Sequence, residues 1–512
     1  MARRLPHGSR LLALVALLAA GCGGAGTTPA GSGPDPATVT PADAAVFFQA
    51  TVRPSGAQRA GVLAAARKVT LMQDPGAALR RLLDRSLGSS NGVSYSRDVE
   101  PWLGQRIGGF VRFDGPDPRH PDYAIAAAIA DRGAFDAALP RLRKAGHERA
   151  AGSYRGVAYA HDPSDRTYDA PVGDFYVGGT LAGLRAAIDA HAGSSLAGAG
   201  SFKDAAGRVP GDALAFVYAD PSTLLAALGR GRSVPPAARR ALAAVAAAGP
   251  VVASLTASAD QIALDASGGL PAGAAASGSS AQVSAGQLPG DAWLAVATPP
   301  LGPLVKAALQ SAGVHDMAAA QVRARLGLDL DRDLLNPLGG LAVFARGESV
   351  LDLGGGVLLQ MTSAAAAQLL ATRLEAIAAA GLHVAPQPLT LAGAHGFQLA
   401  VPQVPQPIVV LAKDSRLAVG YAASSAQDLL APRQRFDASP AGKAALATLG
   451  DGYAASFVLV VPPFAALLRS LAELQVARLS PVLPYLAAYR SLAIGTKRDG
   501  GRISVRIVAA LR

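Results

Sequence analysis

The chain has 512 residues, of which 50% are hydrophobic, 5% aromatic and 16% charged. Its 57 glycines and 36 prolines are too few for a collagen-like or wholly disordered chain, and its single cysteine excludes a disulfide scaffold. The formal net charge is +11, but the arginines are scattered and no aromatic residues interleave with a basic run, so we expect no nucleic-acid binding.

The first 21 residues have the pattern of a signal peptide. Arg3, Arg4 and Arg10 precede an apolar run over residues 11–20, which is too short to span a membrane as a mature helix. Small residues follow and lead into Cys22. This order resembles a bacterial lipoprotein signal, in which the cysteine becomes the first mature residue and carries lipid. Removal of the three arginines would lower the net charge to +8.

Cys22 is therefore the expected lipidation site, and the alternative is an incidental thiol beside an ordinary signal peptide. Residues 22–40 are small, polar and rich in proline, which is typical of a flexible tether. Lipid on Cys22 would be the protein's contact with the membrane. We expect a protein anchored in the cell membrane on its extracytoplasmic face.

The rest of the chain repeats one order of elements. The first copy covers residues 41–267 and the second covers 291–512. The Gly-, Ala- and Ser-rich residues 268–290 are expected to be a flexible linker between them, and the alternative is a long hairpin loop inside one continuous sheet. Each copy contains both apolar strand patterns and amphipathic helices. Many successive strands follow one another directly and are joined by short turns. This pattern predicts an α+β fold of two duplicated domains, each a mostly antiparallel sheet with helices packed on one face.

The helices and strands of the two copies correspond in order. The expected helix at 133–146 matches 364–381, and in each a strand follows (153–162 and 394–403). Next come a strand, turn and helix, a strand that runs into a proline-started helix, and a closing hairpin (174–191, 212–228 and 251–267; 415–432, 453–468 and 491–510). A longer 163–173 loop in the first copy and a proline-rich loop in the second are the expected differences.

One segment carries a family resemblance. The stretch YSRDVEPWLGQRIGGFV, with the strand and helix patterns around it, resembles the DUF3352 family of uncharacterised bacterial envelope proteins. The residues that carry the resemblance are Asp98, Pro101, Trp102, Leu103 and Gly104. The resemblance implies an envelope location and this architecture, and it supplies no biochemical activity.

The second copy keeps Pro337 and Gly339 at the corresponding place but has Leu338 instead of tryptophan. We therefore favour Trp102 as a rigid corner that caps the core over the alternative, a residue that stacks on a ligand or partner. These signature residues are expected to be structural.

The sequence contains no recognisable catalytic or metal-binding motif. The histidines lack zinc-binding spacings, and the chain has no nucleophile elbow and no phosphate-binding loop. Asp329, Asp331 and Asp333 alternate but lack the glycine and distal glutamate of a calcium loop, so a structural or solvated role is expected. We expect no catalytic residues, metal or cofactor.

Three functions remain as hypotheses. The first is a non-catalytic envelope lipoprotein that binds or scaffolds another envelope protein. The second is a carrier of a lipid or other apolar ligand, since many small side chains could leave a cavity. The third is an enzyme whose active site is assembled from residues that lie far apart in the sequence.

Overall fold

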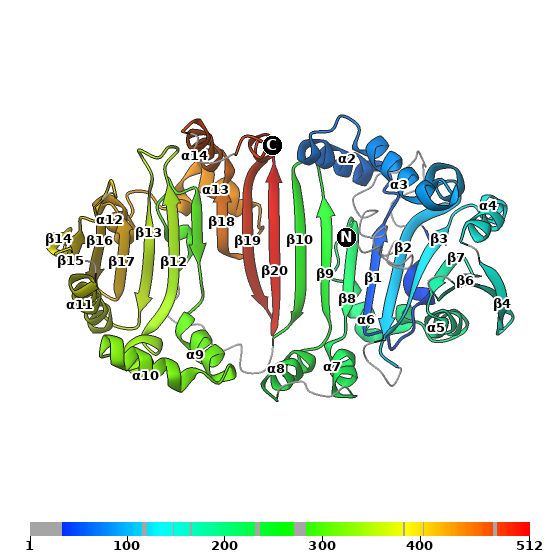
Figure 1. Ribbon diagram of the computed structural model, residues 1–512, viewed down its shortest axis with the longest axis horizontal. Helices are drawn as coiled ribbons and strands as arrows, with labels where there is room; N and C mark the ends of the chain where they lie inside the picture. Colours follow the sequence, from blue (N-terminus) through cyan, green and yellow to red (C-terminus); the bar gives the residue numbers. More distant parts are fainter. Residues whose placement is uncertain are drawn as a thin grey trace. The chain divides into compact units, whose positions relative to one another are not determined.

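The computed structural model describes residues 33–114, 120–146, 148–163, 166–230, 236–270, 283–381, 384–402, 404–474 and 479–512. The chain divides into two compact units (Figure 1). Unit 1 comprises Met1–Ala274 and Arg498–Ser504, and unit 2 comprises Ala275–Lys497 and Val505–Arg512. Cys22 and most of the expected tether lie outside the described residues.

Unit 1 contains an antiparallel sheet. Its strands are β1 (Val46–Thr51), β2 (Leu103–Arg112), β3 (Asp122–Ile129), β4 (Arg149–Tyr154), β5 (Val157–Asp162), β6 (Thr167–Val172), β7 (Phe175–Gly179), β8 (Ala215–Ala219), β9 (Val251–Ala257) and β10 (Gln261–Gly269). Their order is β10-β9-β8-β1-β2-β3-β7-β6-β5-β4. The strand β4 is thus an outer strand, and its pairing with β5 shifts register between Ala150 and Gly152.

Unit 2 repeats this sheet strand for strand. Its strands are β11 (Leu294–Ala297), β12 (Leu338–Arg346), β13 (Gly354–Met361), β14 (Gln387–Leu391), β15 (Ala394–Leu399), β16 (Ile408–Lys413), β17 (Arg416–Tyr421), β18 (Ala454–Val460), β19 (Tyr489–Asp499) and β20 (Arg502–Leu511). Their order is β20-β19-β18-β11-β12-β13-β17-β16-β15-β14. The predicted α+β class, antiparallel sheet and duplication are confirmed.

The helices also correspond. Unit 1 has α2 (Gly56–Thr70), α3 (Pro75–Asn91), α4 (Arg132–Ala145), α5 (Leu181–Ala192), α6 (Gly200–Ala206), α7 (Pro221–Arg230) and α8 (Pro236–Ala247). Unit 2 has α9 (Leu301–Ser311), α10 (His315–Leu326), α11 (Ala364–Gly381), α12 (Ala423–Leu430), α13 (Pro440–Ala447), α14 (Val461–Glu473) and α15 (Leu483–Leu486). Among the described residues, no helix is both long enough and apolar enough to cross a membrane.

Helices cover both faces of each sheet, where the sequence predicted only one covered face. In β3, Ala124, Ala126 and Ala128 pack under α5, whereas Ile125 and Ile129 pack against α4. Because alternate residues of a strand point to opposite faces, β3 is buried on both sides. The strand β16 has the same arrangement: Val410 packs with α11, and Val409 packs with α12.

The structured part of each unit begins before the expected boundary. Residues Pro36–Val39 form a 3-10 helix, η1, in which Ala37 and Val39 are buried, although they belong to the predicted tether. Ala285–Gln287 form the matching 3-10 helix η5 inside the predicted linker, with Leu288 buried beside it. The small and proline-rich composition of these segments predicted a tether and a linker, although a few of their apolar residues are part of the core.

The predicted 163–173 loop also differs from the structure. Residues Thr167–Val172 form β6, which pairs with both β5 and β7. Its counterpart in unit 2 is β16, which follows the proline-rich loop. The two units therefore have the same four strands between their matching helices, and the sequence patterns underestimated this part of the sheet.

Polar substitutions on either face of β16 test the two-sided burial. Val409 and Val410 are 0% and 4% exposed. We expect Val409→Asn and Val410→Asn each to destabilise the protein by about 3–5 kcal/mol, because each removes apolar burial and leaves an amide without partners. Urea unfolding would measure this, with Thr390→Asn on the outer strand β14 as a tolerated control. A sheet covered on one face would tolerate one of the two valine variants.

Candidate functional site

The signature segment forms a π-helical turn, η2 (Tyr95–Val99), that buries the carboxylate of Asp98. The Asp98 side chain is 0% exposed. Its Oδ2 accepts hydrogen bonds from the Ser94 backbone N–H at 2.9 Å and from Arg97 Nη2 at 2.8 Å. On the other side, Arg141 Nε of α4 donates to Oδ1 at 2.9 Å.

The pKa of Asp98 lies well below its usual range. The main cause is the hydrogen bond from Arg97, and the Ser94 N–H and Arg141 add to it, against the opposing effect of burial. Asp98 is therefore a charged group that fastens the turn to α4. This is a structural ion pair with one buried partner, since both arginines are more than half exposed.

Trp102 and Gly104 lie directly behind this turn. Trp102 is 3% exposed, and its Nε1 donates to the Asp98 carbonyl oxygen at 2.7 Å. Its ring meets Phe135 of α4 edge-on at 5.1 Å between centroids. A Cβ at Gly104 would lie 2.9 Å from the Ala128 Cβ, so this position requires glycine. Pro101 is exposed just before β2.

Unit 2 repeats the turn as η6 (Leu330–Leu335), with Asp333 in the place of Asp98. The Asp329 N–H donates to Asp333 Oδ2 at 2.8 Å, and Arg332 Nε donates to Oδ1 at 2.7 Å. These contacts, the Arg332 hydrogen bond first, lower the pKa of Asp333 to about 2. The sequence predicts a structural or solvated role for Asp333, and an Arg-Asp pair marks both turns.

Pro337 and Gly339 follow this second turn. The Pro337 carbonyl oxygen accepts from the Thr362 N–H at 2.9 Å, and Gly339 is buried in β12. The signature residues of the two copies thus occupy matching places at the start of β2 and β12.

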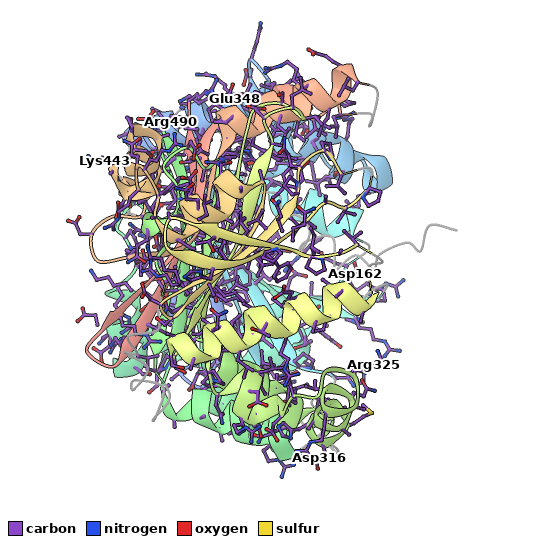
Figure 2. The ribbon with its side chains drawn as sticks, turned by 90° about the vertical axis from the view of Figure 1, so that its left-hand side faces the viewer. Asp162, Asp316, Arg325, Glu348, Lys443 and Arg490 are labelled. Atoms are coloured by element: carbon purple, nitrogen blue, oxygen red, sulfur yellow. The ribbon has the colours of Figure 1, made fainter. Side chains whose placement is uncertain are left out.

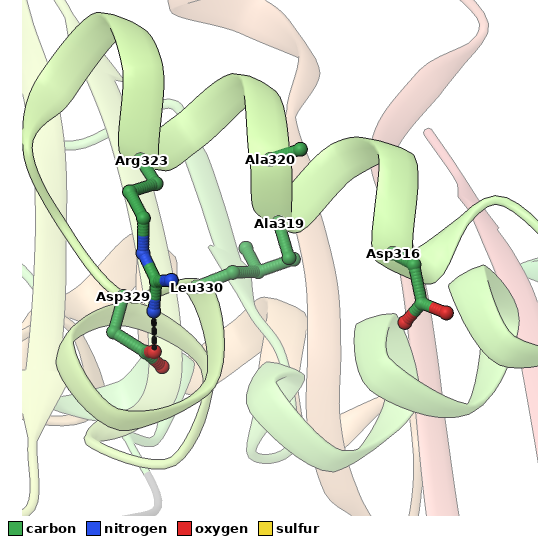
Figure 3. Close-up of a pocket in the computed structure, with 6 residues that line it drawn as sticks. All are labelled: Asp316, Ala319, Ala320, Arg323, Asp329 and Leu330. Carbon is green, nitrogen blue, oxygen red and sulfur yellow. Dashed lines mark hydrogen bonds and ion pairs between the residues drawn. The ribbon is translucent and has the colours of Figure 1, made fainter.

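A pocket of about 260 Å³ lies between η6 and the helix α10 (Figure 3). It is lined by Asp316, Ala319, Ala320, Arg323, Asp329 and Leu330. Arg323 Nη2 pairs with Asp329 Oδ2 at 3.0 Å on one side, and Asp316 stands on the other (Figure 3). Asp329 also caps η6 by accepting from the Arg332 N–H at 2.9 Å.

A second set of charges continues from this pocket. Asp331 Oδ1 lies 3.3 Å from Lys306 Nζ of α9 and 3.2 Å from His315 Nε2. His315 Nδ1 lies 3.2 Å from Asp316, whose side chain projects into solvent (Figure 2). Hydrogen bonding to Asp331, then to Asp316, raises the pKa of His315. Within the described residues, no group of histidines and acids is placed to hold a metal ion.

The contacts between the helix and the turn differ in unit 1, where α3 and η2 correspond to α10 and η6. Asp84 of α3 accepts from the Ser94 hydroxyl at 2.8 Å and from the Ser96 N–H at 2.9 Å. These bonds tie the helix directly onto the turn. In unit 2 the matching helix α10 is tied by the Arg323–Asp329 ion pair, at the edge of the pocket.

Unit 1 also contains a half-buried acidic cluster that the sequence did not indicate. Tyr176 donates to Asp169 Oδ1 at 2.8 Å, and Arg143 lies 3.7 Å from Asp169 and 3.8 Å from Glu148. Burial, and then the nearby Asp169, raise the pKa of Glu148 to about 8. Burial beside Asp169 thus favours the protonated, uncharged form of Glu148.

The second copy has apolar side chains in place of two members of this cluster. Asp169 is the third residue of β6 and Tyr176 is the second of β7, and β16 and β17 have Val410 and Leu417 at these positions. Tyr176 packs with Phe135 of α4, and the two apolar residues pack with α11. Because an apolar packing suffices in unit 2, the ionisable cluster is a feature particular to unit 1.

The fold and these turns define a duplicated antiparallel α+β protein in which each copy is fastened by an Arg-Asp turn. The family described as "Protein of unknown function (DUF3352)" matches residues 11–508. The chain therefore belongs to this family, as the signature residues predicted. A comparison with curated proteins finds no match.

Three crystal forms of TP0453 resemble part of the chain. Form IV is 15% identical, with a TM-score of 0.25, and the match covers 46% of this chain and 80% of that one. Form I is 11% identical, with a TM-score of 0.26 and coverage of 47% and 80%. Form III is 14% identical, with a TM-score of 0.26 and coverage of 47% and 81%.

Removal of the buried charge tests the role of the signature turn. We expect Asp98→Asn to destabilise unit 1 by about 2–3 kcal/mol, because it loses charge-assisted hydrogen bonds from Arg97 and Arg141. The matched variant Asp333→Asn should lower the free energy of unfolding by a smaller amount, because the Asp333 side chain is 12% exposed. Urea unfolding would compare the two, and an Asp98→Asn protein as stable as the parent would contradict this role.

The acidic cluster predicts a pH dependence. The folded pKa of Glu148, about 8, exceeds its ordinary value of 4.5, so between these values the folded state holds a proton that the unfolded state releases. Stability contributed by this group is present at low pH and is lost as pH rises through that window. Glu148→Gln mimics the protonated acid and should flatten the decline.

Thermal unfolding at a series of pH values measures this effect. The midpoint of the parent should fall by several degrees between about pH 5 and about pH 9. Glu473→Gln, at an exposed acid of α14, serves as the control that keeps the parent's profile. An unchanged slope in Glu148→Gln would show that another group governs the pH response.

Proposed function

We propose that this protein is a non-catalytic envelope lipoprotein, anchored by lipid on Cys22, that serves as a binding or scaffolding module. The basic, apolar and small-residue segments before Cys22 support the anchor. The segment between Cys22 and η1 spans at most about 50 Å when fully extended, so a lipid at Cys22 would hold unit 1 close to the membrane.

The pocket beside η6 is the candidate binding site of the proposed module. Arg323 pairs with Asp329 and Asp316 pairs with the neighbouring His315, and none of the pocket's lining side chains is a serine, threonine, cysteine or lysine. Such a site suits recognition of a small polar group better than covalent catalysis. It is also continuous with the charges of Lys306, His315 and Asp331.

The same pocket gives little support to the carrier hypothesis. Its volume of about 260 Å³ lies at the lower end of ligand pockets, which are commonly about 300–1,000 Å³. Three of its six lining residues are charged. An acyl chain would therefore desolvate Asp316, Arg323 and Asp329 without replacing their contacts with water.

Loss of Cys22 tests the proposal. In the native host, Cys22→Ser should abolish incorporation of labelled palmitate, and a high-salt wash should move the variant from the membrane fraction to the soluble extracytoplasmic fraction. The physical reason is that two or more acyl chains hold a protein firmly, whereas a folded surface alone binds reversibly.

Two controls accompany this experiment. The parent protein should take the palmitate label and stay in the membrane fraction after a high-salt wash. Thr28→Ser, a change of similar size in the same segment, should behave like the parent. Lipid labelling that persists without Cys22 would contradict the anchor.

A further inference from the structure

The helical pair α2–α3 ends in an exposed apolar tip. Leu71 and Met72, between the two helices, are 51% and 49% exposed. Leu71 has φ +58°, a left-handed conformation that disfavours a bulky residue. The helices α3 and α10 end in the same conformation on Gly92 and Gly327, so the chain uses glycine where only the turn matters.

Local hydrogen bonds hold the tip in place. Arg67 Nε donates to the Gln73 carbonyl oxygen at 3.1 Å, and Thr70 Oγ1 donates to the Ala66 carbonyl oxygen at 2.7 Å. Lys68 Nζ donates to the Ala259 carbonyl oxygen at 2.5 Å and fastens α2 to the turn between β9 and β10. The apolar tip is therefore presented from a fixed base.

The helices that carry the tip are strongly basic. Residues 56–91 contain two acidic residues, Asp74 and Asp84, against six basic residues, which are Arg59, Arg67, Lys68, Arg80, Arg81 and Arg85. Asp74 accepts from the Ala77 N–H and so caps α3, and Asp84 accepts from Ser94 and Ser96. The net charge of the helical pair is thus positive.

Two of the six basic residues face acids of neighbouring elements. Lys68 Nζ lies 3.7 Å from Asp260, and Arg80 Nη1 lies 3.9 Å from Glu100. The other four arginines still outnumber the two acids of the helices themselves, and Arg81 and Arg85 are exposed. Positive charge therefore remains on the elements that flank Leu71 and Met72.

An anionic lipid surface fits this combination better than a protein partner. Two exposed side chains are too small an apolar core for a stable protein interface, which buries about 1,200–2,000 Å². Shallow insertion of a few apolar groups, with arginine and lysine at the phosphates, is how basic amphipathic elements bind membranes. The positive charge complements a negative lipid headgroup.

We propose that the α2–α3 tip docks on anionic membrane lipid, with Leu71 and Met72 entering the headgroup region and the neighbouring basic residues at the phosphates. This inference rests on the proposed function to the extent that lipid on Cys22 brings unit 1 to the membrane. The tip then fixes which side of unit 1 faces the bilayer. The anchor supplies attachment, and the tip supplies orientation.

Vesicle sedimentation tests this surface without the anchor. The chain from Cys22 onward, produced without the signal peptide and hence without lipid, should bind vesicles of equal parts phosphatidylglycerol and phosphatidylcholine. It should bind phosphatidylcholine vesicles far less, and high salt should release it. The double variant Leu71→Ser/Met72→Ser should bind about tenfold more weakly, because it loses the inserted apolar area.

A matched control separates this surface from general apolar exposure. Leu351 is 95% exposed in the loop after β12, but it lies between Glu348 and Asp352, and Glu348 is labelled in Figure 2. Leu351→Ser should therefore leave vesicle binding unchanged. Arg81→Glu/Arg85→Glu should weaken binding to anionic vesicles and reduce its salt dependence. Circular dichroism and thermal unfolding would verify that each variant is folded.

The outcomes distinguish the two proposals. Failure of the folded parent chain to bind anionic vesicles, or undiminished binding by Leu71→Ser/Met72→Ser, overturns the docking surface and leaves the anchor on Cys22 intact. Absence of palmitate label on Cys22 in the native host, together with vesicle binding through the tip, overturns the anchor and keeps the docking surface. Equal binding to neutral and anionic vesicles overturns the charge-based recognition.

Discussion

Close contact between helices and both faces of each sheet is the constraint on which the rest of the structure depends. A Cβ at Gly183 of α5 would overlap the Tyr123 carbonyl oxygen, and the strand beneath presents a row of alanines to the same helix. Only small side chains permit this approach. Alanines and Gly183 therefore permit the close approach of α5 on this face, and Trp102 and Phe135 pack on the opposite face with α4.

The order of elements could be predicted from sequence, because each copy repeats the same apolar periodicities and proline-started helices. The covered second face was harder to predict. The unbroken apolar runs in β3 and β16 are the signal for it, since a half-exposed strand would alternate with polar residues. The strand β6 was missed because TYDAPV contains an aspartate and a proline, and Asp169 is compensated only by partners from other elements.

The signature residues could be identified from the sequence, but the hydrogen bonds that their side chains make could not. Asp98 owes its contacts partly to Arg141, which lies far along the chain, and Asp333 was hidden among alternating aspartates. Because the chain is duplicated, corresponding positions of the two units can be compared directly. Where unit 2 packs two apolar side chains, unit 1 keeps Asp169 and Tyr176. Buried ionisable groups are seldom the most stable choice, so their presence in unit 1 is a chemical difference between the two copies.

The outer strands β4 and β14 limit how copies of this protein can associate. An open strand edge offers free N–H and C=O groups to a neighbouring chain, and molecules gathered on one surface would meet such edges often. Pro388 removes one N–H donor from β14, and the register shift at Ala150 and Gly152 distorts β4. Both edges are thus poor templates for a further strand. Addition of a further strand at β4 or β14 is disfavoured by the backbone itself, whatever the local density of the protein.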